Sequence, residues 1–359
     1  MPNTANYAER WEPELLEILT QDSLISPFIT TAVKWLSAKT FHFTQMSTSG
    51  YKSHNRNGGW NRGVFVQTDV PFTVTHDRDI EFLVDKLDVD ETNATASMEN
   101  ISKTFVRTQE VPEANALFFS RVAAQAKKLD GYHTETKLSD YTAANVFTKI
   151  KKALGSGKLR RYKAMGALVV YVRSEIMDLL EESTELAKKI EMTQIAEGGI
   201  GIETRVTKID GVPVFEVIDD EVFYDTFNFD GEDGGFAPAE TTYKASSDTS
   251  VVTGKTYYTK SGDKYTAVKS PTGNPSTSSY YEIDAAGSKK INILIASPLT
   301  TKFVPKVNSI YFFAPGAHTE GDGWLYQNRA FSDVFVFPNG KDNKVDSVFV
   351  DTDIAGVDA

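Results

Sequence analysis

The chain has 359 residues, no cysteine and a formal net charge of −11, with 38 Lys and Arg against 49 Asp and Glu. This length allows two domains, or one large domain with an insertion, and a core that needs no covalent links. The absence of cysteine excludes disulfides, thiolate metal sites and cysteine nucleophiles, and the acidic balance argues against a nucleic-acid binder that works through phosphate contacts. No stretch approaches the roughly 20 apolar residues of a membrane-spanning helix, and the first 21 residues do not follow the pattern of a secretory signal.

The N-terminal segment predicts an amphipathic helix. Trp11, Leu15 and Ile18 recur at helical spacing, and glutamates lie toward the other faces. Ser26-Pro27 ends any helical continuation, because the residue before a proline disfavours helical backbone. A lone helix has little of its own chain to pack against, so residues 1–35 are expected to form an arm that lies on a neighbour.

Residues 40–75 predict a long β-hairpin with a wide Ser-, Asn- and Gly-rich tip at residues 47–63. No acid occurs between Phe41 and Thr68, whereas residues 77–91 carry seven acids. A basic arm beside an acidic segment predicts that copies of the chain complement each other. The alternative is a solvated loop next to a solvated helix end. The candidate contact residues between subunits are Trp11, Lys52, Arg56, Trp60, Arg62, Asp77, Asp79 and Glu81.

The middle of the chain alternates helices and strands. A strong helix is expected from Thr108, with Pro112 in its first turn and Gly131 at its end. A second helix over residues 142–154, a buried strand over 167–173 and a third helix over 175–192 follow. Residues 205–215 read as a hairpin with a tight Asp-Gly turn.

Composition changes abruptly at residues 241–284, where Thr, Ser, Tyr and Lys dominate. Residues 254–268 predict strand, turn and strand, and residues 280–282 a further short strand. Apolar strand residues return at 291–295, so we interpret 241–284 as a small all-β insertion. Further strands are expected at 310–313, 324–327, 333–337 and 347–350.

Motifs for chemistry are missing. The five histidines have no metal-ligand spacing, and neither Gly198–Gly201 nor Gly155–Lys158 has the spacing of a phosphate-binding loop. Asp230, Glu232 and Asp233 match no calcium loop, and a linker turn is the favoured interpretation. Other acid clusters are expected in a chain of this charge. We therefore expect no enzyme, no metal and no cofactor.

The segment from His76 to Thr92, continuing through residues 101–105 to 109–113, resembles major capsid proteins of tailed bacteriophages with the Hong Kong 97-type fold, in particular siphophages of Gram-positive bacteria. In that family it joins an extended loop to a long spine helix. The resemblance implies an α+β fold with an N-terminal arm (1–35), an extended loop (36–76), a peripheral domain with spine helix (77–139) and an axial domain (140–240). The all-β insertion (241–284) and return strands (285–359) complete it.

The resemblance also implies a function. Such proteins assemble as pentamers and hexamers into an icosahedral shell around double-stranded DNA, so the chain would be made in the bacterial cytoplasm and reside in the virion. Portal and decoration proteins would be further partners. A separate scaffolding protein is expected, because the N-terminal helix leaves no room for a fused one. Lys52 lies where some relatives crosslink, but no partner asparagine is identifiable. The alternatives are a tail-tube or decoration protein, or an enzyme or carbohydrate-binding module that uses the insertion.

Overall fold

The computed structural model describes residues 23–30, 40–54, 58, 60–85, 98–183, 192–193, 206–229, 235–253, 255–262, 264–276, 279–318, 323–338 and 345–354. The expected N-terminal helix with Trp11 lies outside these residues. So do Arg56, the Gly198–Gly201 segment and the acidic turn at 230–233.

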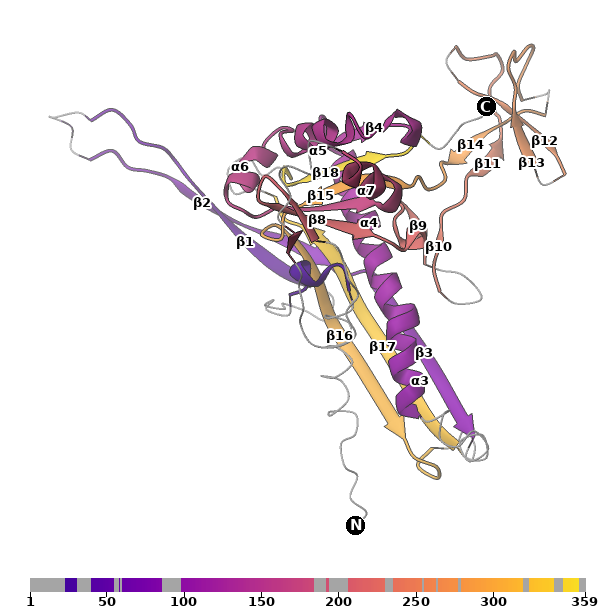
Figure 1. Cartoon of the computed structure of the whole chain (residues 1–359), viewed down its shortest axis with the longest axis horizontal. Coiled ribbons are helices and arrows are strands. Elements are labelled where there is room, and N and C mark those ends of the chain that lie inside the picture. Colours follow the sequence, from indigo (N-terminus) through magenta and orange to yellow (C-terminus); the bar gives the residue numbers. More distant parts are fainter. Residues whose placement is uncertain are drawn as a thin grey trace.

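One long helical rod lies along a three-stranded antiparallel sheet (Figure 1). The rod consists of α3 (Met98–Phe105), the π-helical turn η2 (Val106–Glu110) and α4 (Val111–Lys127). The sheet has the order β16 (Thr301–Phe313), β17 (Gly323–Val336) and β3 (His76–Asp85). Rod and sheet enclose the larger core, in which Phe118 and Phe119 of α4 are fully buried.

The predicted helix with Pro112 in its first turn is confirmed for α4, but helical backbone also extends back from it through η2 and α3 to Met98. A proline inside a helix has no N–H to donate and crowds the carbonyl four residues earlier. Here the turn before Pro112 widens, and the Val111 N–H donates to the Val106 carbonyl, five residues back. This π-type turn lets the helix continue past the proline. The sequence signal therefore marks the first turn of α4, which continues an earlier stretch of helix.

A seven-stranded mixed sheet forms the second body. Its order is β4 (His133–Glu135), β18 (Val348–Thr352), β15 (Ile291–Ala296), β5 (Val169–Arg173), β8 (Val212–Val217), β7 (Val206–Ile209) and β6 (Met192–Thr193). Helices α5 (Val146–Leu154), α6 (Leu159–Ala164) and α7 (Ser174–Glu181) cover one face, and the end of α4 covers the other. β5 is buried on both sides: Val169 and Tyr171 join the α4 core, whereas Val170 and Val172 join the α5–α7 core.

Several strands and helices differ from the sequence prediction in their bounds. The helix expected over 175–192 ends at Glu181. Glu181 and Glu182 lie at the negative end of the helix dipole, which is unfavourable for a negative charge. The strands expected at 324–327 and 333–337 are one strand, β17. The strand expected at 310–313 begins at Thr301, and Pro305 fits because β16 is an edge strand with a register shift at that point.

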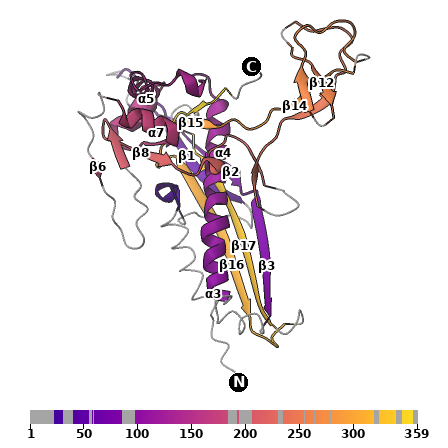
Figure 2. The same ribbon diagram turned by 45° about the vertical axis from the view of Figure 1, so that its right-hand side comes forward.

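The segment predicted as an insertion contains a separate four-stranded sheet that projects from the main body (Figures 1 and 2). Its order is β11 (Thr242–Ala245), β14 (Tyr281–Ala285), β12 (Tyr258–Ser261) and β13 (Lys264–Ala267). The expected strand–turn–strand is confirmed, with Gly262 in the left-handed region (φ +61°). Strand β11 was not foreseen. The short elements η1 (Ser26–Phe28), η3 (Leu138–Asp140), η4 (Asp220–Val222), β9 (Phe227–Asn228) and β10 (Ala237–Pro238) complete the chain.

Candidate functional site

Strands β1 (Thr40–Thr48) and β2 (Phe65–Thr73) form a hairpin; they pair along their whole length and project from the body (Figure 1). Its base is held by aromatic packing: Phe41 is buried, stacks on Phe72 with centroids 5.6 Å apart, and meets the edge of Phe335 at 5.0 Å. The base is therefore fixed to the sheet that carries β16 and β17. The expected hairpin is confirmed.

The outer part of this hairpin exposes large apolar side chains. Trp60 is 94% and Phe65 69% exposed, and Met46, Tyr51, Val64 and Val66 are exposed as well. A lone two-stranded hairpin is marginal in water, and clustered exposed apolar residues mark a surface that another molecule covers. We define the hairpin tip as residues 46–66. The described part of the chain leaves its large apolar side chains uncovered.

Three of the predicted contact residues lie in the hairpin tip. Lys52 donates from Nζ to the Arg62 carbonyl oxygen over 3.2 Å, which braces the loop, and the Trp60 ring lies 6.4 Å from that of His54. The Lys52 and Arg62 side chains are exposed. The structure thus places Lys52, Trp60 and Arg62 on one projecting hairpin, where Lys52 contacts the Arg62 backbone. Their role between subunits stays a prediction.

The other three predicted residues lie on strand β3. Asp77, Asp79 and Glu81 alternate along one exposed face of this edge strand. Asp77 already accepts two hydrogen bonds from Arg329, at 2.8 and 2.6 Å, and Glu81 accepts one from the Gln327 amide. The structure does not bring the acidic group to the hairpin tip of the same chain. Pairing of the two groups across copies of the chain stays a prediction.

The structure shows a basic surface on α5 and α6 that was not predicted from the sequence. Lys152, Arg160 and Arg161 are exposed, and Lys163 donates to Asp210 at 2.8 Å. That hydrogen bond holds the pKa of the Asp210 carboxyl below its ordinary value. The sequence does contain a signal for this basic surface, because no Asp or Glu occurs between Asp140 and Glu175.

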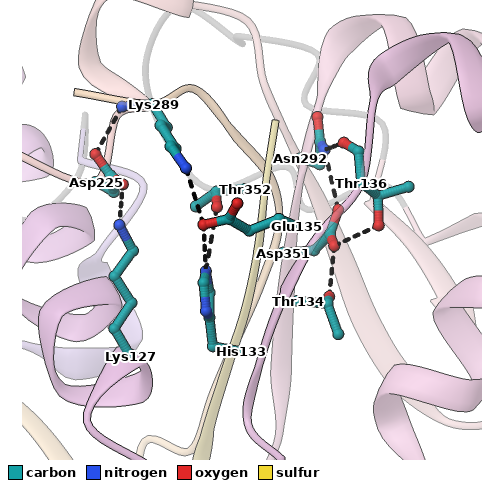
Figure 3. A network of polar contacts seen from close by, with 10 residues as sticks. All are labelled: Lys127, His133, Thr134, Glu135, Thr136, Asp225, Lys289, Asn292, Asp351 and Thr352. Carbon is teal, nitrogen blue, oxygen red and sulfur yellow. Dashed lines mark hydrogen bonds and ion pairs between the residues drawn. The ribbon is translucent and has the colours of Figure 1, made fainter. Parts of the chain in front are cut away.

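A buried polar network ties β4, β15 and β18 together (Figure 3). Asp351 on β18 is 2% exposed and accepts hydrogen bonds from four side chains. The donors are Thr134, Thr136 (2.7 Å), Tyr141 (2.7 Å) and Asn292 (2.9 Å). Burial, with Asp351 as the neighbouring charge, holds the Tyr141 pKa far above its ordinary value, so the phenol stays protonated and donates. The network joins segments more than 200 residues apart, which sequence patterns cannot show.

A second group of charges lies next to it and reaches the base of the insertion (Figure 3). Lys127 at the end of α4 pairs with Asp225, which also accepts the Lys289 backbone N–H at 2.8 Å. The Lys289 ammonium pairs with Glu135 at 2.9 Å, and this hydrogen bond lowers the pKa of Glu135. Burial, followed by the charge of Lys127, lowers the pKa of His133. Every carboxylate in this group has a cationic partner, so the group braces the insertion and resembles no catalytic arrangement.

A cavity of about 860 Å³ lies between the helical rod and the three-stranded sheet. Its lining is mainly apolar, with Ile80, Phe82 and Phe105, and it includes the Glu110 carboxyl. The Glu110 Oε2 atom is enclosed and has no hydrogen-bond partner among the described residues. Burial raises the Glu110 pKa from 4.5 to about 7, the Glu113 charge adds to this, and a hydrogen bond from Asn328 opposes it.

Replacing Glu110 with glutamine should flatten the pH dependence of stability between pH 4.5 and pH 7. The folded chain holds the Glu110 proton more tightly than the unfolded chain, so wild-type stability falls as pH rises through this window. The loss is on the order of 2–3 kcal/mol. Calorimetric melting at pH 5 and pH 8 measures it. Glu81→Gln, on the exposed face of β3, should keep the wild-type pH slope; equal slopes in wild type and Glu110→Gln would contradict the assignment.

Neither a metal centre nor a spanning helix is found in the described part of the chain. No group of three His, Cys, Asp or Glu side chains in this part could hold a metal ion. Among the same residues, no helix has both the length and the apolar character needed to cross a membrane.

No family model and no curated protein matches the sequence. Solved structures do match. The mature capsid of bacteriophage PhiM1 is 12% identical with a TM-score of 0.52, covering 93% of this chain and 87% of that chain. The capsid of cyanophage P-SCSP1u (10% identity, TM-score 0.49, 91% of this chain and 86% of that chain covered) and Mycobacterium phage Bobi (9%, 0.48, 93% and 91%) are also similar. The PhiM1 match shows the fold: this chain has the mixed α+β, Hong Kong 97-type architecture, with the rod in the place of the spine helix.

Proposed function

We propose that this chain is the major capsid protein of a tailed bacteriophage, which assembles with copies of itself into the icosahedral shell that encloses double-stranded DNA. The observation that carries the proposal is the hairpin tip. It holds Trp60 and Phe65 exposed, away from every core formed by the described residues. A second copy supplies the missing cover, and the fold shared with the PhiM1 capsid makes a shell the natural assembly.

The division into capsid domains is part of this proposal. The N-terminal arm takes residues 1–35 and the extended loop residues 36–76. The peripheral domain takes residues 77–139, and the axial domain residues 140–240. Residues 241–284 form the insertion, and 285–359 return to both bodies: β15 and β18 join the seven-stranded sheet, whereas β16 and β17 build the three-stranded one.

The partners follow from the same proposal. The chain forms pentamers and hexamers with itself, and a separate scaffolding protein, a portal and decoration proteins are its other partners. Its net charge of −11 suits a wall that encloses DNA without binding a sequence. Its place is the virion, after synthesis in the bacterial cytoplasm, and we assign the phage to the siphophages of Gram-positive hosts on the resemblance of the His76–Thr92 segment.

Sedimentation velocity of the purified full-length chain at rising concentration tests this function. We expect discrete large species, first of capsomer size and then of shell size, because each copy presents an uncovered apolar tip. A single monomer species at the highest concentration would overturn the proposal.

Deleting residues 242–285 should leave shell assembly intact. Thr242 and Ala285 are cross-strand partners, so the two ends of the insertion lie side by side and a short Gly-Ser link closes the gap without strain. The insertion also has its own core of stacked tyrosines, with Tyr243 and Tyr265 centroids 4.0 Å apart. Electron microscopy of the deleted chain measures the outcome. Loss of particles, with the main body still folded by circular dichroism, would show that the insertion takes part in assembly.

A further inference from the structure

Helices α5 and α6 carry a cluster of positive charge on a chain whose net charge is −11. Residues 146–164, which span both helices and the turn between them, contain seven Lys and Arg and no Asp or Glu. The seven are Lys149, Lys151, Lys152, Lys158, Arg160, Arg161 and Lys163. The net charge of the whole chain therefore hides a local surface of the opposite sign.

One carboxylate of the fold faces several of these cations. Asp210, in the turn between β7 and β8, pairs with Lys163 at 2.8 Å and with Lys151 at 3.4 Å. Arg160 joins these three residues in lining a shallow cavity of about 580 Å³. Three cations around a single carboxylate leave this cavity with an excess of positive charge.

Neither ion pairs nor helix polarity accounts for the rest of the cluster. Asp346 lies 3.7 Å from Lys158, but Lys152, Arg160 and Arg161 are exposed and form no ion pair with the residues that the structure describes. Lys152 lies in the last turn of α5, where a cation is favourable. Arg160 lies in the first turn of α6, where the helix dipole disfavours a cation. A bound anion would offset both the dipole and the mutual repulsion of these charges.

We propose that this surface binds the phosphate backbone of double-stranded DNA without reading its sequence. Protein interfaces centre on apolar anchors, and among the described residues 141–167 Met165 is the one large apolar side chain that is exposed. Single strands bind by stacking bases on aromatic rings, but Tyr141, Phe147 and Tyr162 are buried. A duplex backbone needs only the Lys and Arg donors that this surface offers. The choice of DNA as the polyanion rests on the proposed function, which places the chain beside it.

The first test measures the fluorescence anisotropy of a labelled DNA duplex mixed with the purified, unassembled full-length chain. We expect saturable binding at about 50 mM NaCl that weakens at least tenfold by about 200 mM, because neutralised phosphates release counterions. Labelled poly-L-glutamate should bind at least tenfold more weakly, since its charges are spaced more widely than those of a duplex. No binding of the duplex, or equal binding of poly-L-glutamate, would overturn the proposal with the wild-type chain alone.

The second test reverses the three exposed cations that form no ion pair. The substitutions are Lys152→Glu, Arg160→Glu and Arg161→Glu, combined in one chain. Duplex affinity should fall at least tenfold in this variant. The matched control changes the net charge by the same amount on exposed side chains of the insertion, and it should bind within threefold of wild type. Its substitutions are Lys260→Glu, Lys264→Glu and Lys269→Glu.

Equal loss of affinity in these two variants would mean that general charge explains the binding, and would overturn the surface. Circular dichroism verifies that each variant folds. If the triple reversal does not fold, the milder pair Arg160→Gln and Arg161→Gln takes its place, with at least a threefold loss expected and wild-type affinity as the contrary result.

Closed shells reveal which side of the wall this surface faces. The chain has no cysteine, so Lys152→Cys introduces a unique thiol. A maleimide carried on a polymer too large to cross the wall should label this thiol in unassembled chains and not in intact shells; labelling of intact shells would overturn the contact with enclosed DNA. Only this comparison needs shells, so a chain that binds the duplex and forms no shell would count against the proposed function and leave the surface standing.

Discussion

Replacing Trp60 and Phe65 together with alanine should abolish particle formation while the unassembled chain melts within about 3 °C of wild type. Both side chains are largely exposed, at 94% and 69%, and exposed substitutions outside special sites change stability by at most about 0.5 kcal/mol. At an interface, a buried aromatic anchor contributes about 2 kcal/mol or more, and a shell repeats that loss at every subunit contact. Electron microscopy and sedimentation, together with calorimetry, measure both halves of the expectation.

Ile218→Ala is the matched control for the hairpin tip. Ile218 is 61% exposed and lies just after β8, in the seven-stranded body and outside the tip. We expect normal particles from this variant. If the double tip variant also assembles normally, the tip is not an assembly surface, and the main support for the proposed function disappears.

Replacing Asp351 with alanine should destabilise the chain by about 3–5 kcal/mol, the range expected when one member of a buried charged network is removed. The change leaves four donors, on Thr134, Thr136, Tyr141 and Asn292, without their shared acceptor. Two of them, on Tyr141 and Asn292, are buried and so cannot turn to water instead. Thr134 and Thr136 lie in and just after β4, Tyr141 lies just after η3, and Asn292 lies in β15. We therefore expect this edge of the seven-stranded sheet to loosen as one unit. Chemical denaturation of the unassembled chain measures the change.

Asp130→Ala is the control for that experiment, since Asp130 is an exposed carboxylate in the turn just before β4. It should alter stability by no more than about 0.5 kcal/mol. A loss of similar size in both variants would mean that general charge, and not the buried network, explains the effect of Asp351→Ala.

Local patterns predicted many elements but few of the contacts between them. The β1–β2 hairpin, the Asp210-Gly211 turn and the buried strand β5 follow from alternation and turn residues, and all three are confirmed. Pro112 lies in the first turn of α4 as predicted, but the proline signal did not show that helical backbone extends back through a π-type turn to Met98. The Asp351 network and the Glu110 cavity join residues more than 200 positions apart, and no sequence spacing encodes such pairs.

The predicted contact residues illustrate the same limit. Lys52, Trp60 and Arg62 do lie in the hairpin tip, and Asp77, Asp79 and Glu81 do share one face of β3. They were chosen because a basic hairpin precedes an acidic segment, which is a local property of the sequence. Whether one group meets the other across two copies depends on the assembly, and an intrachain partner such as Arg329 for Asp77 could not be foreseen from spacing.

Electron microscopy of the full-length chain, purified at high concentration, tests the central claim most directly. The account predicts closed icosahedral shells, or the pentamer and hexamer rings from which they form, with the hairpin tip lying over an adjacent subunit. Stacked rings in open tubes, or a field of single monomers, would contradict it.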